Sequence, residues 1–313
     1  MRTIVSVILI LLCFDAAFAN GVSGTIPGSL RHDGRKRFYY VYVSDHYKNN
    51  GQTALVVALH GGGGRARKFG LQVDRGNLLQ ETNRRNMILV FPEGINKKWN
   101  DGRAEIFETR RQEEDRPDDV GFISTLIDKL EQEYGIDPDK VFATGISNGG
   151  FMSVRLALEL SEKIKAIAPV AALLARVHEG KYPQHPVSFL FINGTKDPLV
   201  PFEGGEVRIT RFGRSRGDVL SAKDTIAYFG NHFQCQSNPL VTAMQDAAPK
   251  DGTHSRAIKY QDCQSGVRIN LIDIEGGGHT WPGGAQYLPE SLVGRVSHDF
   301  NASEMIINFF MDQ

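Results

Sequence analysis

The chain has 313 residues, of which 36 are basic and 36 acidic, so its formal net charge at pH 7 is zero. This balance favours neither nucleic acid nor an acidic membrane surface as a partner. The length suits one large α/β domain or two small ones. No repeat, low-complexity tract or linker divides the chain, so we expect a single domain over residues 20–313.

The N-terminus differs in kind from the rest of the chain. Met1 and Arg2 form a short basic region, residues 4–14 are almost wholly apolar, and Ala17-Phe18-Ala19 fits a small-x-small cleavage site. We interpret residues 1–19 as a signal peptide cleaved after Ala19, which makes the mature protein secreted or periplasmic. A membrane anchor is the alternative, but the apolar run is shorter than the roughly 20 residues that a spanning helix needs.

The first part of the mature chain predicts strands alternating with helices. Residues 38–43 alternate aromatic residues with valine, which is typical of a strand. The continuous apolar runs 54–59 and 87–92 indicate strands buried on both faces of a parallel sheet. Residues 67–83, between these two runs, predict a helix.

A glycine-rich loop follows the strand at 54–59. It consists of His60 and four glycines, Gly61 to Gly64, whose backbone N–H groups a ligand can approach without obstruction. In α/β-hydrolases a loop of this kind supplies one of the two oxyanion-hole donors, and Gly62 is our first choice for that donor. A phosphate-binding loop is the alternative, but the segment contains neither G-x-G-x-x-G nor G-K-[ST].

A polar and highly charged segment follows the strand at 87–92. Trp99 lies near its start, and an indole there could form one wall of a substrate pocket, with a surface patch as an equal alternative. Within the charged residues 105–119, we expect residues 110–116 to form a solvated loop. The amphipathic pattern of residues 120–134 then predicts a helix.

The segment Gly145-Ile146-Ser147-Asn148-Gly149-Gly150 lies between an apolar run, 141–144, and a helical pattern, 151–160. Strand, sharp turn and helix are the context that a G-x-S-x-G nucleophile elbow requires. The flanking glycines allow the strand and helix to pack closely, so that the Ser147 hydroxyl is presented at the top of a sheet. Taken alone, the motif fits a plain strand-to-helix connection equally well.

Two later loops supply a candidate acid and a candidate base. Apolar runs at 166–172 and 187–192 predict strands, and Asp197 follows the second of them. Residues 267–274 predict the last strand, and His279 follows it on a glycine-rich loop. Taken singly, such an aspartate is more often a turn residue and such a histidine more often structural.

The order Ser147, Asp197, His279 is that of α/β-hydrolases, and each residue follows a predicted strand, so all three open at one edge of the sheet. We predict that His279 takes the proton of Ser147 and that Asp197 orients the imidazole. Backbone N–H groups of Gly62 and Asn148 would bind the oxyanion. This chemistry requires no cofactor, and no His or Cys cluster in the sequence has metal-ligand spacing.

The remaining cysteines and the C-terminal half add further expectations. Once Cys13 is removed with the signal peptide, Cys235 and Cys263 form an even pair that predicts a disulfide, with two free thiols as the alternative. Residues 201–217 predict a hairpin or flap over the site. The other expected elements are a helix over 224–233 and a terminal helix through Phe310 that begins with a capping box at Asn301-Ala302-Ser303-Glu304.

Several segments together carry a family resemblance: His60-Gly61-Gly62, Trp99 to Arg103, Asp118 to Phe122, the Ser147 elbow, Asp197-Pro198 with Pro201 to Gly205, and Gly277-Gly278-His279-Thr280-Trp281-Pro282. Over nearly the whole mature chain they resemble the secreted polyhydroxybutyrate depolymerase and feruloyl esterase family. The resemblance implies an α/β-hydrolase fold, with a mostly parallel sheet and helices on both faces. It also implies extracytoplasmic ester hydrolysis by the same triad, with Trp99 and Trp281 bordering the pocket.

The resemblance leaves the substrate open. Enzymes that erode solid polyester commonly carry an added binding domain and linker, and the sequence shows neither, so we expect feruloyl or acetyl esters of plant polysaccharide. Trp99 and Trp281 could stack on an aromatic acyl group or a sugar. The alternatives are a polyhydroxybutyrate polyester or oligomer as substrate, a serine peptidase, and a non-catalytic binding module.

Overall fold

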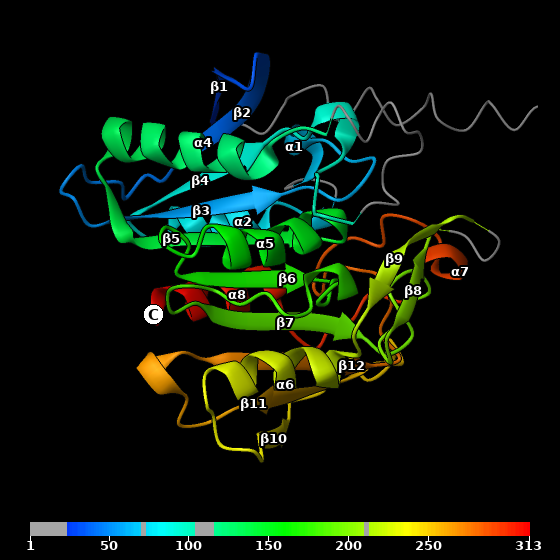
Figure 1. Cartoon of the computed structure of the whole chain (residues 1–313). Coiled ribbons are helices and arrows are strands. Elements are labelled where there is room, and N and C mark those ends of the chain that lie inside the picture. Colours follow the sequence, from blue (N-terminus) through cyan, green and yellow to red (C-terminus); the bar gives the residue numbers. More distant parts are fainter. Residues whose placement is uncertain (1–23, 70–72, 104–115, 210–212) are drawn as a thin grey trace, which may run out of the picture.

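The computed structural model describes residues 24–69, 73–103, 116–209 and 213–313 (Figure 1). Its centre is a ten-stranded sheet with the strand order β1-β2-β4-β3-β5-β6-β7-β12-β11-β10. The run from β4 to β12 is parallel, and antiparallel strands extend the sheet at both ends. The prediction of a mostly parallel α/β-hydrolase sheet is therefore confirmed.

The strands of this sheet are β1 (Thr25–His32), β2 (Arg35–Val43), β3 (Thr53–Leu59), β4 (Met87–Pro92), β5 (Ile136–Ile146), β6 (Ala166–Val170), β7 (Ser188–Gly194), β10 (Leu240–Ala243), β11 (His254–Lys259) and β12 (Ile269–Glu275). A separate hairpin is formed by β8 (Gly205–Arg208) and β9 (Ser215–Val219). The α-helices are α1 (Ala66–Lys68), α2 (Asn77–Asn83), α4 (Asp119–Tyr134), α5 (Asn148–Glu159), α6 (Ala222–His232), α7 (Glu290–Val293) and α8 (Ala302–Met311). Short 3₁₀ turns are η2 (Ile95–Lys97), η4 (Arg176–His178) and η5 (Gln264–Gly266).

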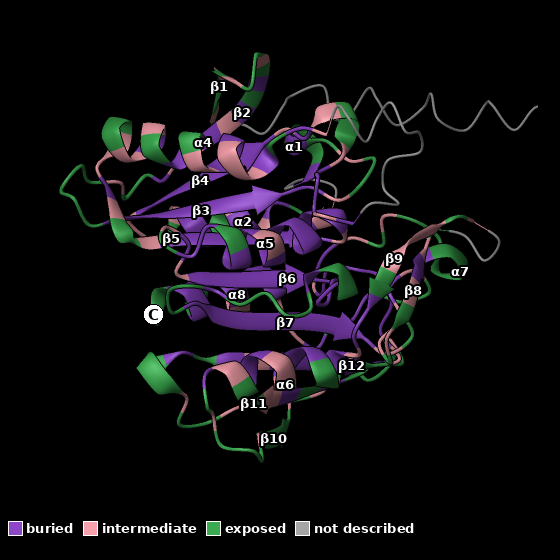
Figure 2. Ribbon diagram, viewed as in Figure 1, coloured by how far each residue is buried: buried purple, intermediate pink, exposed green. Residues whose placement is uncertain are grey.

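Each face of the sheet buries its own hydrophobic core. Strand β3 is buried at every position, because Leu55, Val57 and Leu59 face α4, α5 and α6, whereas Ala54 and its alternate neighbours face α2 and α8. Figure 2 shows the central strands buried along their length and the outer sides of the helices exposed. Helices therefore cover both faces, as the continuous apolar runs indicated.

The prediction of one continuous helix over residues 67–83 is wrong. The structure has two separate helices, α1 and α2, and between them Arg75 and Gly76 have positive φ angles of 59° and 79°. A right-handed helix cannot continue through such residues. The buried Asp74 side chain then accepts hydrogen bonds from the N–H groups of Gly76 and Leu78, so α2 starts afresh.

Several expectations for the second half of the chain are confirmed. Residues 201–217 contain the β8–β9 hairpin, although β9 extends to Val219. Asn301 caps α8 by accepting hydrogen bonds from the N–H groups of Ser303 and Glu304. Cys235 and Cys263 form a disulfide that spans 28 residues of sequence.

Some expectations lie outside the described residues. They are the signal peptide at 1–19 and nearly all of the charged loop at 110–116. In the part of the chain that the structure describes, no helix combines the length and the apolar character needed to cross a membrane.

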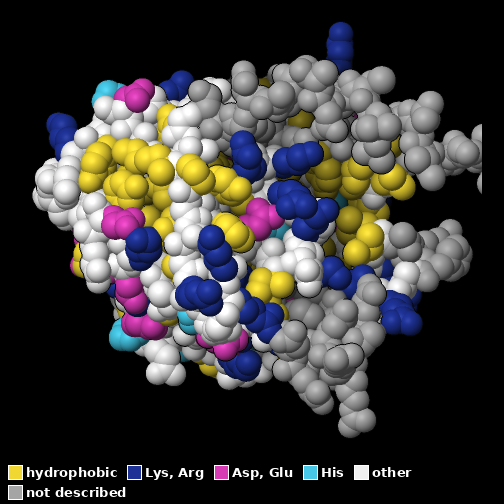
Figure 3. All heavy atoms as spheres, turned by 90° about the horizontal axis from the view of Figure 1, so that it is seen from above, with side chains coloured by type: hydrophobic (Ala, Val, Ile, Leu, Met, Phe, Trp, Pro, Cys, Tyr) yellow, Lys and Arg dark blue, Asp and Glu magenta, His cyan; other side chains and the backbone are white. Residues whose placement is uncertain are grey.

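The β1–β2 edge of the sheet mixes apolar and basic side chains. Ile26 and Phe38 are exposed there, and the Lys36 ammonium lies 5.1 Å from the centre of the Phe38 ring. Figure 3 shows the molecule from the side on which this edge lies, with hydrophobic side chains gathered beside Lys and Arg side chains. Lys36 and Phe38 lie on β2, one strand in from the edge strand β1, which carries Ile26.

Candidate active site

Ser147 occupies a strained turn between β5 and α5. Its φ and ψ angles are 55° and −123°, a combination that side-chain-bearing residues rarely adopt. The turn is possible because glycines surround it: a Cβ on Gly145 or Gly149 would lie 2.5 or 2.1 Å from the Leu59 carbonyl oxygen. The N–H of Ser147 donates to Val170 O at 2.9 Å, which ties the turn to the end of β6.

Asp197 and His279 are joined by a buried hydrogen bond. Nδ1 of His279 lies 2.7 Å from Oδ2 of Asp197, and His279 is only 3% exposed. The other carboxylate oxygen, Oδ1, accepts from the N–H groups of Leu199 and Val200 at 2.8 and 2.9 Å. With Nδ1–H donating to the carboxylate, Nε2 of the neutral imidazole carries the lone pair that could accept a proton.

Hydrogen bonds to the backbone of His279 hold the loop that carries this residue. The Tyr287 hydroxyl donates to the His279 carbonyl oxygen at 2.8 Å, and the N–H of His279 donates to Val293 O. Burial, and secondarily the negative charge of Asp197, raises the pKa of Tyr287, so the phenol keeps the proton that it donates. A Cβ on Gly278 would lie 2.2 Å from Val293 O, so this close approach requires glycine.

The three predicted triad residues leave the same edge of the sheet. Ser147 follows β5, Asp197 follows β7 and His279 follows β12, and these strands are parallel with only β6 between β5 and β7. Figure 1 shows the β8–β9 hairpin beside this edge. Within the described ranges, the Ser147 hydroxyl makes no hydrogen bond to His279, a contact that often forms fully only when substrate binds.

The glycine loop lies beside the elbow. A Cβ built on Gly62 would be 3.6 Å from the Asn148 Cβ, so the two expected donor residues are neighbours. The N–H of Gly63 donates to Lys97 O at 2.8 Å, and that of Gly64 donates to Gly61 O at 3.0 Å. Two of the four glycine N–H groups are thereby occupied, which favours a donor nearer the elbow.

Neither tryptophan borders a pocket, which corrects the expectation for Trp99 and Trp281. Both indoles are 0% exposed, so neither ring can stack on a substrate in this structure. The Trp281 ring packs edge-on against Phe69 with centroids 5.4 Å apart, and its N–H donates to the Ser303 hydroxyl at 3.0 Å. Trp281 therefore anchors the chain two residues beyond His279.

A buried ion pair, which sequence reasoning did not single out, lies behind the elbow. Nη2 of Arg103 is 2.6 Å from Oδ2 of Asp101, and the guanidinium lies 3.6 Å from the centre of the Phe151 ring. His178 donates from Nε2 to the Asp101 carbonyl oxygen at 2.8 Å, and burial lowers the pKa of His178, so its ring is held neutral. The only signal in the sequence was the Trp99-to-Arg103 segment, which entered through the family resemblance alone.

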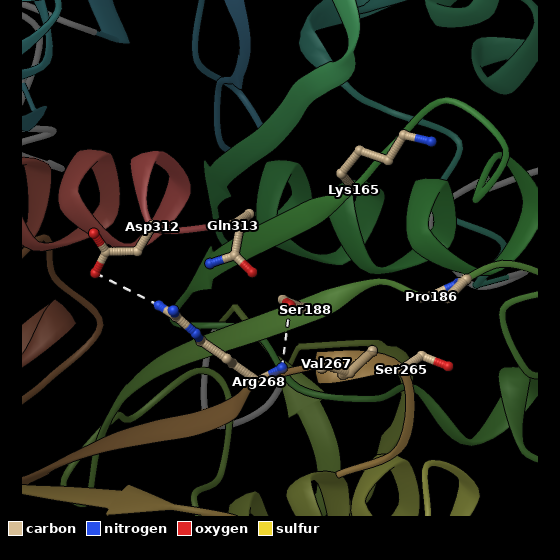
Figure 4. Close-up of a pocket in the computed structure, with 9 residues that line it drawn as sticks. Lys165, Pro186, Ser188, Ser265, Val267, Arg268, Asp312 and Gln313 are labelled. Atoms are coloured by element: carbon tan, nitrogen blue, oxygen red, sulfur yellow. Dashed lines mark hydrogen bonds and ion pairs between the residues drawn. The ribbon is translucent and has the colours of Figure 1, made fainter. Parts of the chain in front are cut away.

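Two hollows on the described surface lie away from these residues. One, of about 200 Å³, is lined by Lys165, Ser188, Arg268, Asp312 and others at the amino ends of the strands, opposite the triad edge (Figure 4). Figure 4 shows Arg268 directed toward Asp312, with which it forms an ion pair. The other, of about 470 Å³, lies against residues 248–251. Neither hollow contains a candidate catalytic residue.

Comparison with known proteins gives a consistent result. A family model described as phospholipase/carboxylesterase matches residues 46–214, which is just over half of the chain. This range includes Ser147 and Asp197. His279 lies beyond it, so the position of that residue rests on the fold described above.

Curated relatives are similar at modest identity. The chain is 28% identical over 264 residues to NocK of Nocardia uniformis subsp. tsuyamanensis, which is named as an esterase, covering 82% of this chain and 74% of that protein. It is 30% identical over 188 residues to an Aspergillus flavus protein named probable feruloyl esterase C, covering 59% of this chain. That alignment spans 64% of the length of the Aspergillus protein.

Among solved structures, acetyl xylan esterase from Aspergillus awamori superimposes with a TM-score of 0.54 and 15% identity, covering 82% of this chain and 94% of that one. At this identity the similarity concerns the fold.

Proposed function

The chain belongs to the phospholipase/carboxylesterase family, and from that premise we propose that it hydrolyses carboxylic esters with Ser147, His279 and Asp197 as its catalytic triad. The observation that carries the proposal is the arrangement at one sheet edge. Ser147 is held at φ 55° between strand and helix, and His279 is hydrogen-bonded to Asp197 at 2.7 Å.

The proposed first half-reaction acylates the serine. Nε2 of His279 takes the proton of Ser147 Oγ while that oxygen attacks the ester carbonyl carbon, and Asp197 stabilises the imidazolium that results. N–H groups of Gly62 and Asn148 bind the oxyanion, each contributing about 3 to 4 kcal/mol to the transition state. Collapse of the intermediate breaks the bond to the alcohol, which leaves with the proton from His279.

The second half-reaction hydrolyses the acyl-enzyme, with water as the nucleophile and Ser147 Oγ as the leaving group. His279 takes a proton from water, whose oxygen attacks the acyl carbon, and the new intermediate expels Ser147 Oγ, which regains a proton from His279. The products are a carboxylic acid and the free enzyme, and each proton that His279 accepts is returned within the same half-reaction.

The substrate class within this proposal is a feruloyl or acetyl ester of plant polysaccharide. Its support is the names of a relative, feruloyl esterase C, and of a protein with the same fold, acetyl xylan esterase. Because Trp99 and Trp281 are buried, aromatic stacking by these residues no longer supports it.

We also propose that the protein is exported. The support is the composition of residues 1–19 and the Cys235–Cys263 disulfide, since disulfides persist in oxidising compartments. N-terminal sequencing of the protein from the periplasm or culture medium should start at Asn20. An intact N-terminus on active protein would contradict export by this route.

Ester hydrolysis by wild type and Ser147→Ala tests the function. The substrates are p-nitrophenyl acetate, butyrate and octanoate, methyl ferulate and a hydroxybutyrate oligomer. We expect the wild type to cleave at least one ester and the variant to lose several orders of magnitude in kcat/KM. Cleavage of the oligomer alone would overturn the feruloyl and acetyl assignment. Equal inactivity on every ester would overturn ester hydrolysis, leaving a peptidase or a binding module.

A further inference from the structure

Trp99 connects the two loops that hold the proposed oxyanion donors. Its backbone N–H donates to Oδ1 of Asn148 at 2.8 Å, and its carbonyl oxygen accepts from Nδ2 of Asn148 at 3.0 Å. Its indole N–H donates to the His60 carbonyl oxygen at 2.9 Å. One fully buried residue of a third loop is therefore bonded to the elbow on one side and to the glycine loop on the other.

On the glycine side, Trp99 contacts His60, and the ring of His60 in turn holds the peptide unit between Gly61 and Gly62. The carbonyl oxygen of Gly61 accepts from Nδ1 of His60 at 2.8 Å and from the N–H of Gly64 at 3.0 Å. In a trans peptide the C=O and the following N–H point in opposite directions, and the described chain contains no cis bond. Holding Gly61 O therefore fixes the direction of the Gly62 N–H.

The loop that carries Trp99 also supports the glycine loop directly. The N–H of Gly94 donates to Nε2 of His60 at 3.0 Å, so both ring nitrogens of this histidine are occupied. Gly63 donates its N–H to Lys97 O at 2.8 Å. To present that carbonyl, Asn96 and Lys97 take positive φ angles of 52° and 60°, which non-glycine residues rarely adopt.

On the elbow side, the Asn148 carboxamide is fully used. Besides its two bonds to Trp99, Nδ2 donates to Oδ2 of Asp101 at 2.8 Å. Arg103 holds that carboxylate in turn. Nη1 of Arg103 is buried without a hydrogen-bond partner, but the Asn148 carboxamide is bonded at both its oxygen and its nitrogen. A buried amide that is bonded in this way holds one geometry, because a displacement leaves a polar group unpaired in a low-dielectric interior. Fixing the Asn148 side chain therefore also restricts the position of the backbone N–H of the same residue.

We propose that the Asn148 carboxamide and Trp99 are positioning groups that set the separation and direction of the two oxyanion donors. The inference rests on the proposed function, since it gives these side chains a task only if an oxyanion forms. Donors stabilise a transition state when they are already aimed at the site where charge develops. Loosening the link between the two donors should therefore lower kcat and leave ground-state binding of the ester nearly unchanged.

The test uses Asn148→Ala in the full chain, which removes the carboxamide and keeps the backbone donor. We expect kcat for p-nitrophenyl butyrate to fall roughly 10- to 100-fold while KM changes less than threefold. Phenylboronic acid, which forms a tetrahedral adduct on a serine hydroxyl, should lose inhibitory affinity by a similar factor. Trp99→Phe, which removes the indole N–H together with part of the buried ring volume, should shift kcat and boronate affinity in the same direction by less.

Ser161→Ala is the matched control. The Ser161 hydroxyl is buried and accepts from the N–H groups of Gln184 and His185 at 3.0 and 3.1 Å, so it clamps a loop backbone away from both donor loops. This variant should lower Tm to a similar extent as Asn148→Ala while kcat and boronate affinity stay within twofold of wild type.

The outcomes separate this inference from the proposed function. An inactive Ser147→Ala together with an Asn148→Ala enzyme of wild-type kcat overturns the positioning role alone. The positioning role is also overturned if Asn148→Ala raises KM and lowers kcat together while boronate affinity is unchanged. If Asn148→Ala does not fold, a Trp99→Phe enzyme with unchanged kcat and boronate affinity overturns it, and a wild type that cleaves no ester overturns both proposals.

Discussion

Nδ1 of His279 and Oδ2 of Asp197 lie 2.7 Å apart, although 82 residues separate them in the chain. The contact exists because β7 and β12 are parallel neighbours, so the loops that follow them leave the sheet side by side. The Asp197 carboxylate is held at both ends, by the imidazole and by two backbone N–H groups of the next turn.

Asp197→Asn should preserve the turn and reverse the tautomer of His279. The amide oxygen can still accept from Leu199 and Val200, but its NH₂ would face Nδ1 and place the ring proton on Nε2. We expect kcat to fall by about 10⁴-fold at neutral pH, with Tm nearly unchanged. Ester kinetics and thermal unfolding check this, and a kcat within tenfold of wild type would show that Asp197 does not orient the base.

Glycine-to-alanine substitutions at Gly149 and Gly62 should differ sharply. Alanine within a helix normally stabilises by about 1 kcal/mol, but a Cβ at Gly149 would lie 2.1 Å from Leu59 O and 2.6 Å from His60 O. We expect Gly149→Ala to lose several kcal/mol of unfolding free energy or not to fold. Gly62→Ala, whose Cβ meets Asn148 at an ordinary 3.6 Å, should stay within about 1 kcal/mol.

Urea denaturation of the two glycine variants provides the comparison. Equal losses for both would mean that the packing of β3 against the start of α5 is looser than described.

Asp74→Asn should change the pH dependence of stability. Burial raises the pKa of Asp74 to about 7, while the N–H groups of Gly76 and Leu78 lower it to a smaller extent. Because the native state then holds a proton that the unfolded state loses above its ordinary pKa of 3.8, this group's contribution to stability falls as pH rises through the interval up to about 7.

The measurement is the difference in unfolding free energy between wild type and Asp74→Asn at pH 4, 6 and 8. The variant should gain on the wild type by a few kcal/mol between the first and last values. A difference independent of pH would show that Asp74 has the same pKa in the folded and unfolded chain.

Replacing Cys235 and Cys263 together by alanine should lower stability without altering catalysis. The bond spans 28 residues, for which loop entropy gives about 3.5 kcal/mol. It joins the chain after α6 to the chain before β12, near the amino ends of the strands. Tm should therefore fall while kcat at 25 °C stays within twofold. A large loss of kcat in folded protein would show that this end of the sheet is coupled to the triad.

The central strands and the elbow could be predicted because their signals are local. The run at 54–59 is apolar at every position, and the glycines around Ser147 mark a turn that larger residues cannot form. The pairing of Asp197 with His279 also followed, because the order of loops on a parallel sheet determines which side chains share an edge.

The errors and omissions have non-local causes. Trp99 and Trp281 lie in polar, glycine-rich segments, and they are buried by contacts far away in sequence, among them those with His60 and Ser303. Strands β10 and β11 were not predicted. β10 is exposed at every position, and the buried side chains of β11 are the small residues Ser255 and Ala257, so neither strand shows an apolar pattern.

The loops around the site differ in how tightly they are packed, and this difference has a consequence for directed evolution. Residues 60–64, 94–103 and 145–150 are joined by the hydrogen bonds of Trp99 and Asn148, and Gly145 and Gly149 leave no room for a Cβ. A mutant library aimed at these residues should therefore yield fewer folded enzymes than one aimed at exposed positions. Ile209, Leu288 and Leu292 are exposed, and they lie on the hairpin and on the loop that follows His279. Substitutions at these positions could change the ester preference while the contacts among the triad residues stay unchanged.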